Sequence, residues 1–164
     1  MKIGIFSDIH DNLNSLKESS KALKECDQFI CCGDLCSPFV VKTIGECFSK
    51  KVHIVFGNND ADKYRMMLVG NSFPHLKFYG EYVELKLANR IISINHFDNI
   101  GNAIAKAPGY DLVCFGHNHK KEIRVDDSDG KIILNPGEIY GGLSGVASAA
   151  IYDTERHEAY LISI

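Results

Sequence analysis

Short apolar runs alternate with amphipathic stretches over the first half of the chain. The runs are typical of strands, and the stretches between them place apolar residues at helical spacing. The predicted strands span residues 2–6, 28–32 and 51–56, and the predicted helices span residues 13–25, 38–49 and 60–69. Ser15 and Glu18 form a capping-box pair for the first helix, and Pro38 suits the first turn of the second. This rhythm predicts a parallel sheet covered by helices.

The second half of the chain is richer in strand patterns. Its predicted strands span residues 76–79, 81–88, 91–95 and 111–115, with one helix at 99–107 that Pro108 and Gly109 end. Two hairpins follow, pairing 121–126 with 131–135 and 148–153 with 156–163. Because no linker or repeat interrupts the pattern, we predict a single domain over residues 1–164. Its fold class is α/β, a sandwich of two mixed β-sheets flanked by helices.

Composition narrows the class of protein without naming a function. A formal net charge of −3 and the lack of a long Lys/Arg run argue against stable nucleic-acid binding. No apolar stretch approaches the roughly 20 residues of a membrane span. The chain enters its first strand directly after Met1, which leaves no room for a signal peptide, so we expect a cytoplasmic protein. Its six cysteines are then expected to be reduced and to act as small apolar residues.

Side chains that bind metal ions follow five of the predicted strands, each directly after the apolar run. They are Asp8, His10, Asp34, Asn58, His96, His117 and His119. Since the carboxyl ends of parallel strands meet at one edge of a sheet, we expect these side chains to lie together. Asp8 and His10 are two residues apart, so an extended backbone points both the same way. Mixed oxygen and nitrogen ligands suit Mn²⁺, with Ni²⁺, Fe²⁺, Co²⁺ or Zn²⁺ as alternatives, rather than Ca²⁺.

The number of ligands suits two divalent transition-metal ions, about 3.5–4 Å apart in such sites, rather than one. Two such ions outweigh the charge of Asp8 and Asp34, which leaves a positive centre that attracts a phosphate ester. Each residue alone has a plainer reading: Asp8 as a helix cap, Asn58 as part of a turn, a strand-end histidine as a surface residue. The ordered series, with glycines at several loop entries, favours the metal centre.

The series resembles the calcineurin-like metallophosphoesterase superfamily, and the short length and the Asn135-Pro136-Gly137 element are similar to its small bacterial and archaeal phosphodiesterase branch. The resemblance covers residues 3 to about 140 and implies two ligand sets that share Asp34. The first set is Asp8, His10, Asp34 and His119, and the second is Asp34, Asn58, His96 and His117.

Three neighbours of the ligands depart from that family pattern. Ser37 stands where many members have a carboxylate, Asn59 where many have a histidine, and Phe97 where glycine is usual. An amide at Asn59 can hold a phosphate oxygen but is a poor proton donor, so substrates with good leaving groups should react best. Asp60 is the second catalytic candidate. It is expected either to orient a ligand histidine or to cap the helix at 60–69.

These features predict a phosphoric ester hydrolase, in which a water activated by two metal ions attacks a small phosphodiester directly. We find no protein nucleophile, and the remaining histidines, His53, His75 and His157, are expected to be structural or to lie on the surface. The alternatives are a phosphomonoesterase or nucleotide pyrophosphatase on the same centre, or a non-catalytic scaffold, because the superfamily includes a small retromer subunit of this fold. The predicted partner is a small phosphoester substrate, and the sequence allows a homo-oligomer.

Overall fold

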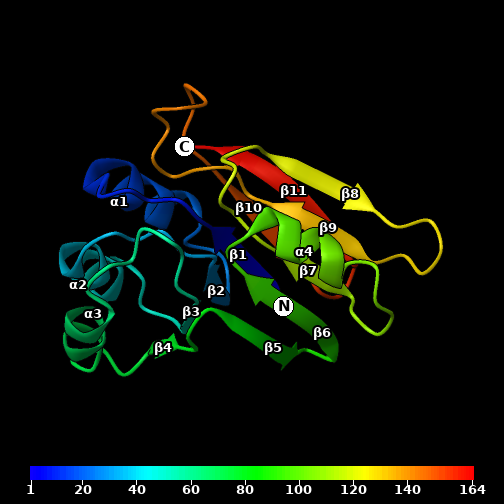
Figure 1. Cartoon of the computed structure of the whole chain (residues 1–164), viewed down its shortest axis with the longest axis horizontal. Coiled ribbons are helices and arrows are strands. Elements are labelled where there is room, and N and C mark those ends of the chain that lie inside the picture. The colour runs from blue at the N-terminus through cyan, green and yellow to red at the C-terminus, as the bar shows by residue number, and fades with distance from the viewer.

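Two β-sheets lie face to face, with helices on both outer surfaces, in the computed structural model of residues 1–164 (Figure 1). The six-stranded sheet has the order β11-β10-β1-β2-β3-β4. Its strands are β1 (Lys2–Phe6), β2 (Gln28–Cys31), β3 (Val52–Ile54), β4 (Leu76–Phe78), β10 (Ser148–Asp153) and β11 (Glu158–Ser163). The first four of these run parallel, and β10 and β11 extend the sheet in antiparallel fashion.

The five-stranded sheet has the order β5-β6-β7-β9-β8. Its strands are β5 (Tyr82–Leu87), β6 (Arg90–Asn95), β7 (Leu112–Cys114), β8 (Glu122–Val125) and β9 (Ile132–Asn135). Strands β6, β7 and β9 run parallel, while β5 and β8 are antiparallel edges. Both sheets are therefore mixed, and the predicted fold class is confirmed.

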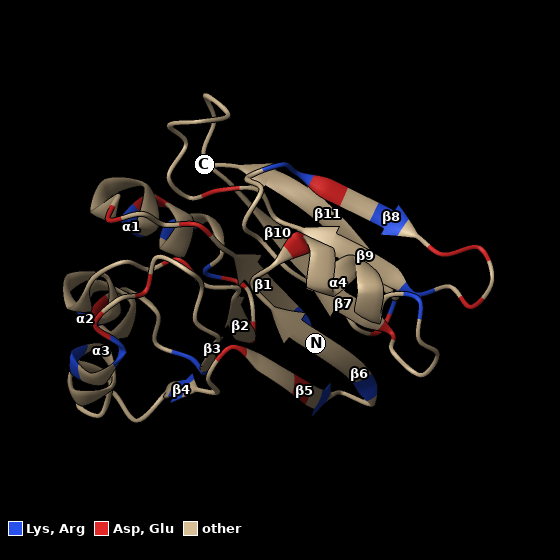
Figure 2. Ribbon diagram, viewed as in Figure 1, with Lys and Arg blue, Asp and Glu red and all other residues tan.

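Four helices cover the two sheets. They are α1 (Leu13–Ala22), α2 (Pro38–Cys47), α3 (Lys63–Gly70) and α4 (Asp98–Ile104). The first three lie on the six-stranded sheet, and α4 lies on the five-stranded one (Figure 1). None of the four combines the length and the apolar character needed to cross a membrane. Lysine and arginine positions are dispersed over α1, α3, β4, β6 and β8 rather than gathered on one face (Figure 2).

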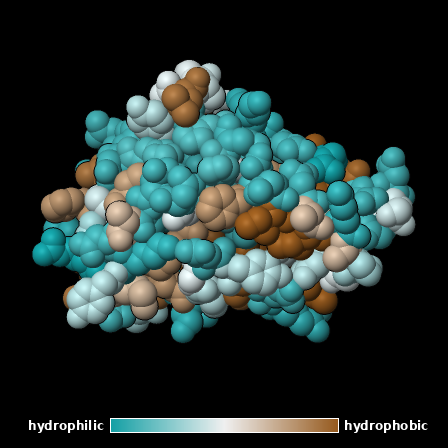
Figure 3. Space-filling model, viewed as in Figure 1, coloured by the Kyte–Doolittle hydropathy of each residue, from teal (hydrophilic) through white to brown (hydrophobic).

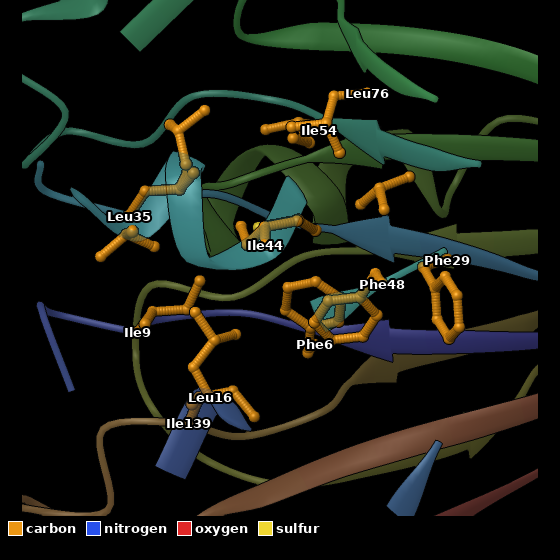
Figure 4. Close-up of a cluster of buried hydrophobic side chains, with 14 of the residues drawn as sticks. Phe6, Ile9, Leu16, Phe29, Leu35, Ile44, Phe48, Ile54, Leu76 and Ile139 are labelled. Carbon is orange, nitrogen blue, oxygen red and sulfur yellow. The ribbon is translucent and has the colours of Figure 1, made fainter. Parts of the chain in front are cut away.

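The alternating pattern of β1 supplies two cores at once. Ile3 and Ile5 point between the sheets, where they join Ile92 of β6 and other apolar side chains. Phe6 points the other way, under the helices, and stacks on Phe48 with ring centroids 5.1 Å apart (Figure 4). Because side chains of β1 pack in both cores, the loop that follows β1 is held from two sides.

Two helix starts differ from the sequence prediction. The α1 helix is capped by Asn12, whose side-chain oxygen accepts from the Ser15 backbone N–H at 3.1 Å, so the capping box at Ser15 is wrong. The α3 helix begins at Lys63, capped by Asp62, so Asp60 is not its cap. In both cases the carboxamide or carboxylate that can reach the N–H group three residues later is the side chain that caps.

His53 is a buried structural residue of β3, as predicted, and it makes stability depend on pH. It is only 3% exposed, and its ring nitrogens lie 2.8 Å from the Tyr79 hydroxyl and 2.8 Å from Gln28 Oε1. Burial lowers its pKa to about 4, and Lys51 adds to the effect.

The unfolded chain binds a proton at His53 near pH 6.5, whereas the folded protein binds one only near pH 4. The stability from this group is therefore complete above pH 6.5 and is lost as the pH falls towards 4. We expect the loss to approach about 3 kcal/mol. Urea unfolding near pH 4.5 and near pH 7.5 measures it, and His53→Gln should show a much shallower pH dependence. If the free energy of unfolding changed equally with pH in both proteins, buried His53 would not be the cause of the pH dependence.

Candidate metal centre

The seven candidate ligands meet where five parallel strands end. Asp8 and His10 follow β1, Asp34 follows β2, and Asn58 follows β3 in the six-stranded sheet. His96 follows β6, and His117 and His119 follow β7 in the facing sheet. The site is thus built from the carboxyl ends of strands in two facing sheets, rather than at the edge of one sheet as the sequence analysis expects. Asp8 and His96 are fully buried and Asp34 is 1% exposed, while the other ligands are more accessible.

One group of ligand atoms comes from Asp8, His10 and His119, within 4.8 Å of one another. His119 Nε2 lies 3.4 Å from Asp8 Oδ1, and His10 Nε2 lies 3.8 Å from the same oxygen. The two imidazole rings stack with centroids 5.0 Å apart. These three residues belong to the first ligand set that the family resemblance implies.

A second group comes from Asp8, Asp34 and His96, also within 4.8 Å of one another. Asp34 Oδ2 lies 3.3 Å from His96 Nε2 and 3.4 Å from His10 Nε2, so one carboxylate faces a histidine of each implied set. Asn58 Oδ1 lies 3.1 Å from His96 Nε2, next to this group. The second grouping contains Asp8, which the resemblance assigns to the first set alone.

His117 lies beside the second group without being part of it. Its ring centroid is 5.1 Å from that of His96, and its backbone N–H donates to the Asp8 carboxylate at 3.1 Å. The Phe97 ring stands edge-on to both imidazoles, with centroids 5.2 Å from His96 and 5.1 Å from His117. Phe97 therefore borders the site closely, as the sequence comparison with the family anticipates.

The electrostatics of the site favour positive charge. The Asp8 carboxylate, with help from Asp34, raises the pKa of His10 above its usual value. Burial alone would lower the pKa of His96, but Asp34 and Asp8 raise it overall. Burial likewise opposes ionisation of Asp34, yet His96 and Asn59 hold its pKa well below its usual range. A site that draws protons onto its histidines in this way also attracts cations.

Strained backbone conformations gather at the ligands. Positive φ angles occur at Asp8 (53°), His10 (43°), Asp34 (54°), His117 (72°) and His119 (60°). Such conformations are uncommon for residues with a side chain and persist only where the surrounding structure enforces them. Asp8 and His10 therefore do not lie on the extended backbone that the sequence analysis expects for them, because both follow the end of β1 in left-handed conformations. The loops are therefore held in a fixed geometry for binding.

Asp60 does not perform either role that the sequence suggests. Its carboxylate accepts backbone N–H bonds from Gly57 at 2.7 Å, Cys36 at 2.8 Å and Asp34 at 3.1 Å. It contacts no ligand histidine and does not cap α3, so both expectations are wrong. Instead, this 2%-exposed carboxylate ties the loop after β2 to the loop after β3. Backbone N–H groups buried in loops need an acceptor, and the Asp60 carboxylate supplies one to three of them.

Asn59 holds the central carboxylate. Its backbone N–H donates to Asp34 Oδ1 at 2.9 Å, and its side-chain amide donates to Asp34 Oδ2 at 2.7 Å. The glycine two residues earlier makes this approach possible, because a Cβ at Gly57 would lie 2.2 Å from Asp34 Oδ1. Asn59 therefore positions a ligand in this structure, and its contact with a substrate stays a prediction.

Sequence reasoning missed Glu138, which is fully buried beside the site. Its Oε2 atom lies 2.7 Å from His119 Nδ1, and its Oε1 atom accepts from the backbone N–H groups of Leu143 and Ser144. A carboxylate on the far nitrogen of a histidine fixes the tautomer that presents Nε2 to a metal ion. The signal available was its place directly after the Asn135-Pro136-Gly137 element.

We expect Glu138→Gln to lower metal affinity by about 10–100-fold while the fold is retained. The amide can no longer offer two acceptor oxygens, so it cannot serve His119 and the loop amides together. Isothermal titration of the metal-free protein with Mn²⁺ measures the change. Glu122→Gln is the matched control, because Glu122 pairs with Arg124 on β8 away from the site. Equal affinities for the two variants would show that Glu138 has no such role.

The donor set and its surroundings fit a metal ion. His10 Nε2 is buried and has no hydrogen-bond partner, although it points at the two aspartates. A buried nitrogen without a partner is costly and calls for a ligand. Beside it opens a cavity of about 400 Å³, lined by His10, Asn59, His119, Tyr140 and Leu143. Metal binding here would leave an open side for a substrate.

A sandwich of two mixed sheets with Asp, His and Asn side chains at the strand ends defines a metal-binding hydrolase fold. The chain belongs to the calcineurin-like phosphoesterase superfamily, whose domain model matches residues 1–157. It is 28% identical to a phosphodiesterase of Methanocaldococcus jannaschii over an alignment of 162 residues, and this alignment covers 96% of each chain. The solved structure of an archaeal phosphodiesterase superposes with a TM-score of 0.91 at 27% identity over all of both chains. A phosphoesterase from E. coli shares the fold, with a TM-score of 0.67, 18% identity and full coverage of both chains.

Proposed function

We propose that this protein is a metal-dependent phosphodiesterase that hydrolyses small phosphodiesters by direct attack of water. The observation that carries the proposal is the Asp34 carboxylate, which lies 3.4 Å from His10 and 3.3 Å from His96. A carboxylate between two groups of nitrogen ligands suits a site for a pair of ions. The similarity to proteins described as phosphodiesterases supports the choice of substrate class.

The residues present would hold two divalent transition-metal ions in the two ligand sets that share Asp34. Mn²⁺ is the first candidate, with Ni²⁺, Fe²⁺, Co²⁺ and Zn²⁺ as alternatives, because imidazole and carboxylate ligands accept all of them. When bound, such ions lower the pKa of water and offset charge on the phosphoryl oxygens.

The protein's own residues position these groups and limit the substrate. Asn59 fixes both oxygens of Asp34, and Glu138 fixes the ring of His119. The cavity lining includes no lysine or arginine, its histidines are candidate ligands, and its one hydroxyl is that of Tyr140, a phenol and therefore a weak acid. A leaving group must therefore depart with little help from a protein acid, so esters of acidic alcohols and phenols should react fastest.

The proposal is tested with metal-loaded protein and a panel of esters. Bis(p-nitrophenyl) phosphate should be hydrolysed in the presence of Mn²⁺ or Ni²⁺, with a higher kcat/KM than p-nitrophenyl phosphate or a nucleoside diphosphate. A higher kcat/KM on p-nitrophenyl phosphate would indicate a phosphomonoesterase, and a higher kcat/KM on the nucleoside diphosphate would indicate a pyrophosphatase. Metal binding without turnover of any ester would point to a scaffold.

A further inference from the structure

A second cavity borders the metal centre on the outer face of the five-stranded sheet. Its volume is about 380 Å³, within the range of small-molecule sites. The lining residues are Glu81, Tyr82, Asn95, Phe97, Ile100 and Ile104. They come from the start of β5, the end of β6 and the α4 helix, where apolar side chains gather on the surface (Figure 3). This cavity has no role in the hydrolysis described above.

Asn95 is the unusual residue of this cavity. It is 1% exposed, yet neither its Nδ2 nor its Oδ1 atom has a hydrogen-bond partner. Its neighbour Ile94 points into the core between the sheets, so the Asn95 side chain points outward, under α4. A buried amide without partners destabilises the fold, and an apolar residue would fill this position at lower cost. The amide therefore leaves one donor and one acceptor side by side without a partner at the wall of the cavity.

A single aromatic ring lies between the cavity and the metal centre and contacts both. Phe97 lines the cavity, and the same ring contacts the imidazoles of His96 and His117. Asn95 directly precedes the candidate ligand His96 in the chain. A group in this cavity would therefore lie beside a phosphate held at the metal centre.

The lining of the cavity offers no cation to bind a second phosphate. Its charged residue is Glu81, which is acidic and pairs with Lys63 at 2.6 Å on the rim. Two aromatic rings, Tyr82 and Phe97, and two isoleucines complete the lining. The cavity thus suits a neutral, flat group with hydrogen-bonding atoms along one edge.

We propose that this cavity is a subsite for the nucleobase of a nucleoside phosphodiester, an inference that rests on the proposed phosphodiesterase function. A carboxamide pairs with the adjacent donor and acceptor of a base edge, adenine N6 and N7 being the well-known case. The rings of Phe97 and Tyr82 offer stacking surfaces for the base. The ester bond to the leaving group would then lie at the metal centre.

Two substrates with the same leaving group test the subsite. Adenosine 5′-(p-nitrophenyl phosphate) and methyl p-nitrophenyl phosphate share the p-nitrophenolate leaving group and differ in the second alcohol, which is adenosine or methanol. We expect kcat/KM to be at least about tenfold higher for the adenosine ester. A ratio near one would overturn the proposal, even if both esters are hydrolysed.

Two variants of the cavity lining test whether the preference for the adenosine ester arises there. Asn95→Leu and Ile100→Asp should each reduce the ratio of the two kcat/KM values by about fivefold or more, because they remove the amide or charge the apolar wall. Val125→Asp is the matched control for Ile100→Asp, since the two side chains are 56% and 45% exposed respectively and Val125 lies on β8. Asn95→Leu should not lower the Tm, since no hydrogen bond is lost. An unchanged ratio in both variants would place the base elsewhere.

A binding experiment separates this proposal from the proposed function. Adenosine, which carries no phosphate, is titrated into the metal-free protein while NMR follows the Asn95 side-chain amide and the Ile100 and Ile104 methyl groups. Saturable shifts of all these signals, with the isoleucine methyl shifts lost in Asn95→Leu, support the subsite even if no ester is hydrolysed. No shifts up to the solubility limit of adenosine would overturn it, even if diesters are hydrolysed.

Discussion

Asp34→Asn is expected to reduce hydrolysis of bis(p-nitrophenyl) phosphate by about 10³-fold or more, because the shared ligand of both metal sites is removed. The substitution preserves shape but replaces a charged oxygen by an amide nitrogen. In the place of Oδ2, that nitrogen would face the Asn59 side-chain amide, which now donates at 2.7 Å, and His96 Nε2, which lies 3.3 Å away. In the place of Oδ1, it would face the Asn59 backbone N–H, which now donates at 2.9 Å. Both arrangements replace an attraction with a repulsion, so the second ion should be lost as well as the activity.

Metal analysis accompanies the rate measurement. We expect the variant to retain at most one equivalent of Mn²⁺ after dialysis, against two for the original protein. Asp127→Asn is the control, because Asp127 lies in an exposed turn after β8. Near-normal rates in Asp34→Asn would show that the two ligand sets do not depend on a shared carboxylate, and the proposed function would fail with them.

The fold was largely readable from the sequence because its two periodicities are clear. The parallel strands β1, β2, β3 and β7 consist of apolar residues and glycine apart from Lys2, Gln28 and His53, and they are buried over nearly their whole length, since both faces of their sheets are covered. The hairpin edge β5 instead alternates exposed and half-buried residues. The ligands were readable because each follows such a run directly, where backbone direction alone decides which edge it reaches.

Contacts between loops were not readable in the same way. Glu138 reaches His119 across 19 residues, and Asp60 reaches Asp34 and Cys36 across 26 and 24. No periodicity encodes such pairs, because they depend on how two irregular segments fold against each other. Asn95 is a related case: as a polar residue in a strand it looked ordinary, and only the packing of α4 shows that it is buried without partners.

Gly116→Ala is expected to lower activity by about 100-fold, through displacement of Asp8. A Cβ at this position would lie 2.0 Å from Ser7 Oγ and 2.4 Å from Asp8 Oδ2, and both residues are fully buried. The Asp8 carboxylate also accepts the His117 backbone N–H, so the loop after β7 would have to move away from it. We further expect a loss of about 1–3 kcal/mol in the free energy of unfolding from overpacking.

A double variant shows which of the two collisions matters for function. Ser7→Ala removes an Oγ atom that has no hydrogen-bond partner, so combining it with Gly116→Ala should recover much of the stability. The collision with Asp8 Oδ2 remains, so Mn²⁺ affinity and hydrolysis should stay impaired. Gly116 has no positive φ, so the collisions rather than backbone strain cause the loss; Gly80→Ala is the opposite case, because its φ is +81° and a Cβ there meets nothing within 4 Å. If the double variant regained full activity, Gly116 would be required for packing against Ser7 rather than for placing a metal ligand.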